Sequence, residues 1–217
     1  MTRIVAALLL FSTAAIEARA QTSSAFGTCI PITAANRNDV GCFIVTEQKL
    51  GALENGPVYW HVTRFRSRAL ADAAIDSRSS VIEAFGHPWL LTIAGARWRS
   101  AKGTHVAAIG PLPIQNGVQY SALYMQASMR PGMKSAIHTH SGPEAWYTLS
   151  GQTCLETPNG TQVGRPGRQV IVPGNLPMEL TATGKSLRRS LVLILHDSSR
   201  KPTTIETTWK PRGLCEH

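Results

Sequence analysis

Residues 132–151 read Gly-Met-Lys-Ser-Ala-Ile-His-Thr-His-Ser-Gly-Pro-Glu-Ala-Trp-Tyr-Thr-Leu-Ser-Gly and carry the strongest functional signal in the chain. The two imidazoles of His138 and His140 and the carboxylate of Glu144 form a ligand set that imidazole-binding divalent metals favour. Side chains two residues apart on a strand point to the same face, so both histidines could reach one ion. A turn at Ser141-Gly142-Pro143 could then bring Glu144 in from the next strand. The alternative interpretation is a pair of solvated histidines on a strand edge.

The spacing of this stretch resembles the first motif of the cupin family. It runs Gly132, five residues, His138-x-His140, three residues, Glu144, six residues and Gly151, and it fits that motif at every fixed position. A partial second motif follows, in which Gly167 and Pro173 fit. The usual Pro-x-Gly-x-Pro-His ending instead reads Pro-Gly-Asn-Leu-Pro-Met over residues 173–178. The resemblance covers residues 118–200, which is under half of the chain.

The resemblance implies a mostly β fold, a double-stranded β-helix (the jelly-roll cupin barrel) with a metal inside one end. Carried over residue by residue, it makes His138, His140 and Glu144 metal ligands and puts Met178 where a histidine would be the fourth ligand. A thioether is a soft ligand that suits copper(I) better than hard divalent ions. Met178 therefore either leaves an open coordination position, as catalytic metals need, or marks a site that has lost its metal.

The resemblance further implies a metal-dependent cupin. Together with the signal-peptide pattern described below, it leads us to interpret the chain as an exported enzyme of the oxygenase, isomerase or lyase type acting on a small polar molecule. Its cofactor would be one divalent transition metal, with Fe, Mn, Ni, Zn and Cu all open. Glu144 would be a ligand, or a catalytic base if it leaves the metal. The rival interpretation is a cupin that binds a small molecule, or has a structural role, without catalysis. Cupins often form dimers, so a homodimer is open as well.

Two further residues are candidates for substrate binding. Trp146 follows Glu144 by two residues, so it shares the inward face of that strand and is expected to wall the cavity. Arg130 flanks the metal loop and could attract an anionic substrate. The alternatives are core packing for Trp146 and an ordinary surface charge for Arg130.

The N-terminus has the pattern of a secretory signal peptide. Arg3 precedes an apolar run over residues 4–16, and Ala18-Arg19-Ala20 forms a small-x-small cleavage signature. The run is too short to span a bilayer, so we expect cleavage near Ala20, a periplasmic or secreted protein and no transmembrane segment. The alternative is a buried N-terminal helix.

The net charge bears on the partners of the protein, and the cysteines bear on its location. The formal net charge of +9 favours anionic surfaces or substrates, and it is also compatible with a solvated basic surface or with binding to anionic polymers. No nucleic-acid-binding module is recognisable, so no nucleic-acid partner is expected. Disulfides are plausible in an oxidising compartment, and four cysteines allow three pairings. Of these we favour Cys29 with Cys42 and Cys154 with Cys215.

The chain divides into a signal peptide (1–20), an N-terminal α+β extension (21–117), the cupin barrel (118–200) and a C-terminal tail (201–217). Runs rich in β-branched and aromatic residues predict the strands. Ser67 is expected to cap a short helix over 68–75. We expect the strands of the extension to continue the sheets of the barrel and the helix to pack outside. The predicted strands span 42–45, 58–62, 81–85, 89–93, 106–109, 120–129, 136–140, 145–149, 154–157, 170–172, 178–181 and 187–195.

Overall fold

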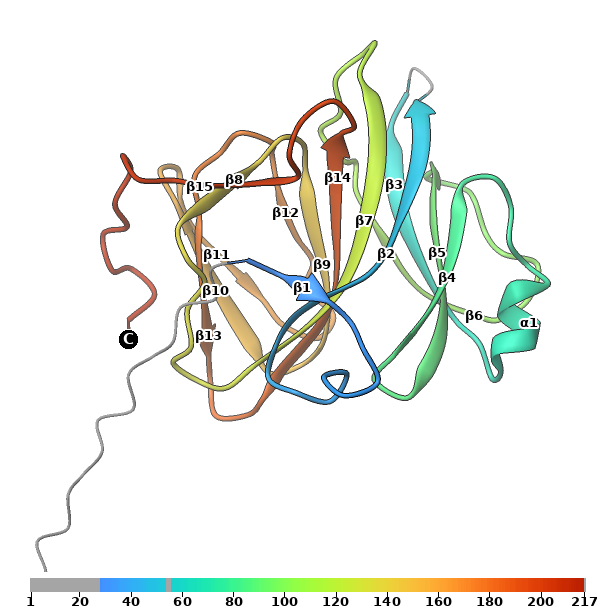
Figure 1. Ribbon diagram of the computed structural model, residues 1–217, viewed down its shortest axis with the longest axis horizontal. Helices are drawn as coiled ribbons and strands as arrows, with labels where there is room; N and C mark the ends of the chain where they lie inside the picture. Colours follow the sequence, from blue (N-terminus) through green and yellow to red (C-terminus); the bar gives the residue numbers. More distant parts are fainter. Residues whose placement is uncertain (1–27, 54–55, 217) are drawn as a thin grey trace, which may run out of the picture.

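The computed structural model describes residues 28–53 and 56–216, and the protein is mostly β, as the sequence predicted. The expected signal peptide lies outside the described residues. No helix within the described ranges has the length and apolar character needed to cross a membrane. The sheets form layers: a four-stranded sheet with α1 at one end of the molecule, a six-stranded sheet in the middle, and the remaining barrel strands at the other end (Figure 1).

The six-stranded sheet is the centre of the molecule, with the order β1-β2-β7-β14-β9-β12. Its long antiparallel strands β7 and β14 are paired over ten residues, from Arg188 opposite Met129 to Asp197 opposite Tyr120. Both strands are buried along nearly their whole length, because each face of the sheet is covered by another layer. The six strands are β1 (Ile30–Pro31), β2 (Gly41–Ala52), β7 (Gln119–Met129), β14 (Arg188–Asp197), β9 (Glu144–Ser150) and β12 (Val170–Val172).

The barrel closes when this sheet faces a second one, whose strands are joined in the order β11-β10-β13. Isolated bridges from Lys134 to Thr181 and from His138 to Met178 connect β13 to the segment that leads into β8. In chain order, β7 to β14 therefore pass back and forth between the two sides of the barrel, with β10 and β11 as a hairpin on one side, as in a jelly roll, which confirms the predicted fold. The strands of this second sheet are β10 (Gln152–Thr157), β11 (Gly160–Gly164) and β13 (Glu179–Thr183). A separate two-stranded sheet consists of β8 (His138–His140) and β15 (Thr203–Ile205).

The strands of the first half mostly do not extend the barrel's sheets, so that prediction is wrong except for β1 and β2. They form a separate sheet, β4-β5-β3-β6, which packs on the outer face of the six-stranded sheet. The reason is that Trp60 and Ile93 of this sheet bury their side chains against Tyr124 and Leu193, which point away from the barrel interior. The strands are β3 (Val58–Arg64), β4 (Ser79–Ala84), β5 (His87–Gly95) and β6 (Thr104–Ile109).

The helix and the C-terminal segment also differ in detail from expectation. The helix α1 (Arg68–Asp72) begins at the predicted cap, where the Ser67 hydroxyl accepts from the Leu70 N–H, but it ends three residues earlier than predicted. The C-terminal segment is more than a tail, because Thr203–Ile205 form β15, which pairs antiparallel with β8. The end of the chain thus contributes a strand next to the two predicted metal-binding histidines.

Candidate metal centre

His138 and His140 lie on the three-residue strand β8, and Glu144 is the first residue of β9. The turn between them is pressed against β14: the Leu195 N–H donates to the Pro143 carbonyl over 2.8 Å. Only glycine fits at position 142, since a Cβ there would lie 2.0 Å from the Leu195 carbonyl oxygen. This tight turn brings Glu144 to the two imidazoles, and the ligand atoms of all three residues lie within 4.8 Å of one another.

Backbone carbonyls fix the orientation of both imidazole rings. The Nδ1 of His138 lies 2.7 Å from the Ala136 carbonyl, and the Nδ1 of His140 lies 2.9 Å from the Pro202 carbonyl. Because a carbonyl only accepts, each Nδ1 must carry the proton and donate, which leaves each Nε2 with a free lone pair. Metal-ligating histidines are typically held in this way by a hydrogen bond from the other ring nitrogen.

The atoms that face the centre of the cluster lack ordinary partners. The Nε2 of His140 and the Oε2 of Glu144 are buried, and neither has a hydrogen bond, although they approach each other to 3.3 Å. The other Glu144 oxygen, Oε1, accepts from the Trp146 indole N–H over 2.9 Å. Buried polar atoms without partners are costly. A cation held by His138, His140 and Glu144 would satisfy these atoms, so the residues present fit a divalent metal.

The protonation states also suit a metal. Burial, followed by the neighbouring His140, lowers the pKa of His138, so this ring stays neutral at neutral pH. Burial alone would raise the pKa of Glu144, but His140, His138 and the Trp146 N–H together lower it, so the carboxyl group is ionised. Neutral imidazole and ionised carboxylate are the forms that coordinate metals.

A small cavity of about 80 Å³ adjoins the cluster inside the barrel. Trp146 lines it, at the position where the sequence analysis expected a wall residue. Arg188 also lines it and is 1% exposed, with its guanidinium 5.6 Å from the centroid of the Trp146 ring. The other lining residues are mostly apolar: Thr28, Cys29, Cys42, Met125, Ala127, Met129, Ser135, Leu180, Val192, Ile194 and Thr203.

Met178 and Arg130 lie elsewhere. Met178 is fully buried among the apolar side chains of the barrel core and is not among the residues that line the cavity; its backbone pairs with that of His138. Arg130 is exposed in the turn after β7 and does not line the cavity either. The structure thus brings together His138, His140, Glu144 and Trp146, and leaves Met178 and Arg130 apart from them.

Sequence reasoning did not identify Arg188 as a site residue. The next residue, Arg189, is exposed, whereas Arg188 points into the barrel. The available signal was parity: on a strand that begins at Arg188, the side chains of residues 188, 192 and 194 share one face. The support that Pro202 and Thr203 give to His140 was also missed, because nothing in the sequence pairs residues 62 and 63 positions apart.

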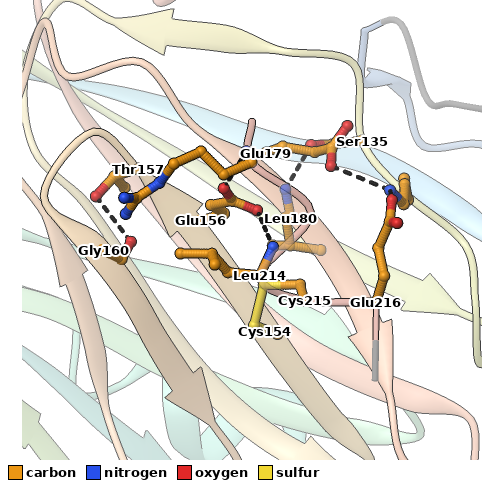
Figure 2. The surroundings of a disulfide bond; sticks show 12 residues. Ser135, Cys154, Glu156, Thr157, Gly160, Glu179, Leu180, Leu214, Cys215 and Glu216 are labelled. Atoms are coloured by element: carbon orange, nitrogen blue, oxygen red, sulfur yellow. Dashed lines mark hydrogen bonds and ion pairs between the residues drawn. A yellow bond between two sulfur atoms is a disulfide. The ribbon is translucent and has the colours of Figure 1, made fainter. Parts of the chain in front are cut away.

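The C-terminal segment is fastened to β10 by a disulfide and by hydrogen bonds (Figure 2). Cys215 is disulfide-bonded to Cys154 of β10, and the Leu214 N–H donates to the buried carboxylate of Glu156. The Arg212 N–H donates to the same carboxylate. A second disulfide joins Cys29 to Cys42 and lies at the cavity wall. The first disulfide thus ties the segment that follows β15 to β10, and the second lies at the cavity itself.

The barrel has the arrangement of a double-stranded β-helix. No protein-family model and no curated protein matches the chain. Three solved structures that it resembles are a cupin superfamily protein from Desulfitobacterium hafniense (15% identity, 40% of this chain and 74% of that one, TM-score 0.33), a DMSP lyase from Ruegeria pomeroyi (19%, 39% and 42%, 0.34) and a salicylate 1,2-dioxygenase from Pseudoaminobacter salicylatoxidans (18%, 40% and 24%, 0.34). The match spans less than half the length of the lyase and of the dioxygenase. Likeness at this level does not bear on activity or substrate.

Proposed function

We propose that the protein is an exported, metal-dependent cupin enzyme that acts on a small polar molecule. One divalent transition metal would be held by the Nε2 atoms of His138 and His140 and by Glu144. The barrel of residues 118–200 would be the catalytic unit, and residues 21–117 would form a supporting layer. The two disulfides support an oxidising, extracytoplasmic location.

The observation that carries the proposal is the pair of buried atoms without hydrogen bonds, His140 Nε2 and Glu144 Oε2, beside a second oriented imidazole. Two histidines and a carboxylate are also the facial set of non-haem iron oxygenases, and they leave coordination positions for substrate. When bound, such an ion supplies Lewis-acid or dioxygen-binding chemistry. This chemistry suits oxygenation, isomerisation or elimination.

The chain's own groups would prepare the site for that chemistry. The Trp146 N–H holds Oε1 of Glu144, so the carboxylate would present Oε2 to the ion in a fixed direction. The apolar walls exclude bulk water, which strengthens electrostatic interactions inside the cavity. Glu144 would act as a ligand first. It could serve as a base only if it left the metal, because its lowered pKa favours the ionised form.

Elemental analysis of the purified protein tests the metal. We expect about one equivalent of a transition metal in the wild type, and a large loss in the His138→Ala variant. The matched control is His87→Ala, which removes an exposed histidine of the four-stranded sheet. Less than about 0.1 equivalent in the wild type, even after soaking with metal, would contradict the proposal. Full metal content in His138→Ala would contradict the ligand assignment.

The second candidate is a cupin that binds a small molecule without turning it over. The observation that favours it is Met178, which is packed in the core where the family pattern has a fourth ligand. Oxygen-uptake and product assays on the metal-loaded protein with candidate substrates distinguish the two. Stoichiometric metal and ligand binding with no turnover would favour this second candidate.

A further inference from the structure

Arg188 is a buried cation inside the barrel, on the wall of the same cavity as the histidine cluster. It is the first residue of β14, and its guanidinium lies over the Trp146 ring, whose N–H donates to Glu144. Its Nη1 donates to the Met129 sulfur over 3.6 Å. Its Nε and Nη2 are buried and have no hydrogen-bond partner.

Among the residues that the structure describes, no acidic side chain forms an ion pair with Arg188. Glu144 is the only acid among the described residues that line the cavity, and it is committed to Trp146 and to the histidine cluster. Burial lowers the pKa of Arg188 to about 10, while Glu144 opposes that shift, so the guanidinium remains charged at neutral pH. Buried charges in proteins are normally paired, and a protein that keeps one unpaired beside a cavity is suited to an anionic ligand.

We propose that Arg188 binds the carboxylate group of a small substrate inside the barrel. This inference rests on the proposed function, since it assigns the substrate class of the same site. The planar guanidinium offers parallel N–H donors that match the two oxygens of a carboxylate, and Nε and Nη2 form one such pair of donors. The ligand would lie between Arg188 and the His138–His140–Glu144 cluster.

Charge and size both favour a small carboxylate. A divalent ion with Glu144 would leave one positive charge, and Arg188 adds a second, so the buried site would lack negative charge without an anionic ligand. A cavity of about 80 Å³ with mostly apolar walls has room for a few non-hydrogen atoms. The aliphatic part of a short-chain acid would contact residues such as Met125 and Val192.

The alternative role for Arg188 is purely structural, as a cation over the Trp146 ring. That role would use the face of the guanidinium and would not require any anion. The two roles differ in what a neutral ligand does: only a carboxylate-binding site separates acetate from its neutral analogue acetamide.

The test is calorimetric titration of the full-length protein with acetate, acetamide and inorganic phosphate, both with its metal and after chelation, with the metal content of each sample measured. The variants are Arg188→Met, Arg188→Lys and Arg189→Met. The last is the matched control, because Arg189 is the next residue on the same strand but is exposed. We expect acetate to bind and acetamide not to bind. Arg188→Met should weaken acetate binding about 10- to 100-fold, Arg188→Lys less, and Arg189→Met should leave it unchanged.

Equal acetate affinity in wild type and Arg188→Met, acetamide binding as well as acetate, or a preference for phosphate would each overturn the inference. If Arg188→Met fails to fold, the acetate affinity of Arg188→Lys decides. This variant keeps a cation in the barrel but loses the paired N–H donors of the guanidinium, so it should bind acetate more weakly than the wild type. A wild type without metal contradicts only the proposed function. In that case acetate binding by the metal-free protein, and its loss in Arg188→Met, would still support the assignment of Arg188.

Discussion

On one face of the six-stranded sheet, Ala145, Leu191 and Leu193 pack against the four-stranded layer in a core of apolar side chains. On the other face, at alternate positions of the same strands β9 and β14, Glu144 and Arg188 point into the barrel. The strands are shared, and only the parity of each residue decides to which face it contributes. The outer face holds the layers together, whereas the inner face carries buried charged groups. The two faces should therefore respond differently to substitution.

The largest expected effect on stability comes from the outer face. Leu193 is fully buried between the layers, so Leu193→Ala should lower the free energy of unfolding by about 2–5 kcal/mol, through lost burial and a cavity. The measurement is chemical denaturation of the metal-free protein. The metal content and the acetate affinity of the folded protein should be unchanged.

The matched variant is Val192→Ala, which removes methyl groups from the adjacent residue on the inner face, at the cavity wall. It should cost less stability but alter acetate affinity. If Leu193→Ala changed ligand binding as much as Val192→Ala does, the two faces would be coupled and the comparison would fail.

The next prediction concerns the covalent tie of the C-terminal segment. The disulfide Cys154–Cys215 spans 61 residues of sequence, and removing it as the Cys154→Ala, Cys215→Ala double variant should cost about 2–4 kcal/mol. The metal affinity should also fall, by roughly tenfold, because β15 and the Pro202 carbonyl hold His140.

Thermal or chemical unfolding and metal titration with a competing chelator measure these two effects. The control is Lys134→Ala, which breaks a more exposed contact between Glu216 and the barrel. An unchanged metal affinity in the double variant would show that the histidine strand does not depend on the tether.

Much of the inner face followed from the sequence, because its signal is local. The spacing of His138, His140 and Glu144 needs only a strand, a tight turn and a second strand, and the structure has these elements. Trp146 followed from parity on the same strand as Glu144. Short-range geometry of this kind does not depend on the rest of the fold.

The outer face was harder to predict. The run Leu191–Val192–Leu193–Ile194–Leu195 is apolar without alternation, and the sequence analysis used it only as a long barrel strand. Such a run indicates burial on both faces, and so a second layer over the barrel. The partners of this layer could not be deduced, because which of the early strands pair with one another depends on contacts distant in sequence.

The third prediction tests whether the inner face is costly. Arg188→Met replaces an incompletely paired buried cation with an apolar side chain of similar length, so it should raise the free energy of unfolding of the metal-free protein by about 1–3 kcal/mol. Denaturant unfolding of the wild type and the variant measures the difference. Arg189→Met, with its cation exposed, should change stability by less than about 0.5 kcal/mol. A clear loss of stability in Arg188→Met would mean that its contact with Trp146 stabilises the fold, and that the inner face is not strained.

The smallest expected effect concerns the pH dependence of stability, to which the buried histidines of the four-stranded layer and those of the barrel should contribute differently. His61 is fully buried in the four-stranded layer, with Nδ1 3.3 Å from Nε2 of His105, and burial lowers the pKa of both rings. In the unfolded chain a histidine titrates near 6.5, so below that pH the unfolded state binds a proton that the folded state resists. Protonation therefore favours unfolding, and stability should fall as the pH drops below 6.5 toward the lowered pKa values.

The slope of the free energy of unfolding against pH is proportional to the number of protons taken up on unfolding. Replacing His61 by Gln should reduce that number by up to about one per molecule, and the difference in the free energy of unfolding between pH 7 and pH 5 measures it. The His87→Gln variant, which replaces an exposed histidine of the same layer, is the matched control. His138 also has a lowered pKa, and its contribution should appear in the metal-free protein. It should become larger when metal is bound, because the ion and the proton compete for the same ring. If metal left the pH dependence of the free energy of unfolding unchanged, the barrel histidines would behave like those of the four-stranded layer. That result would contradict metal binding on the inner face.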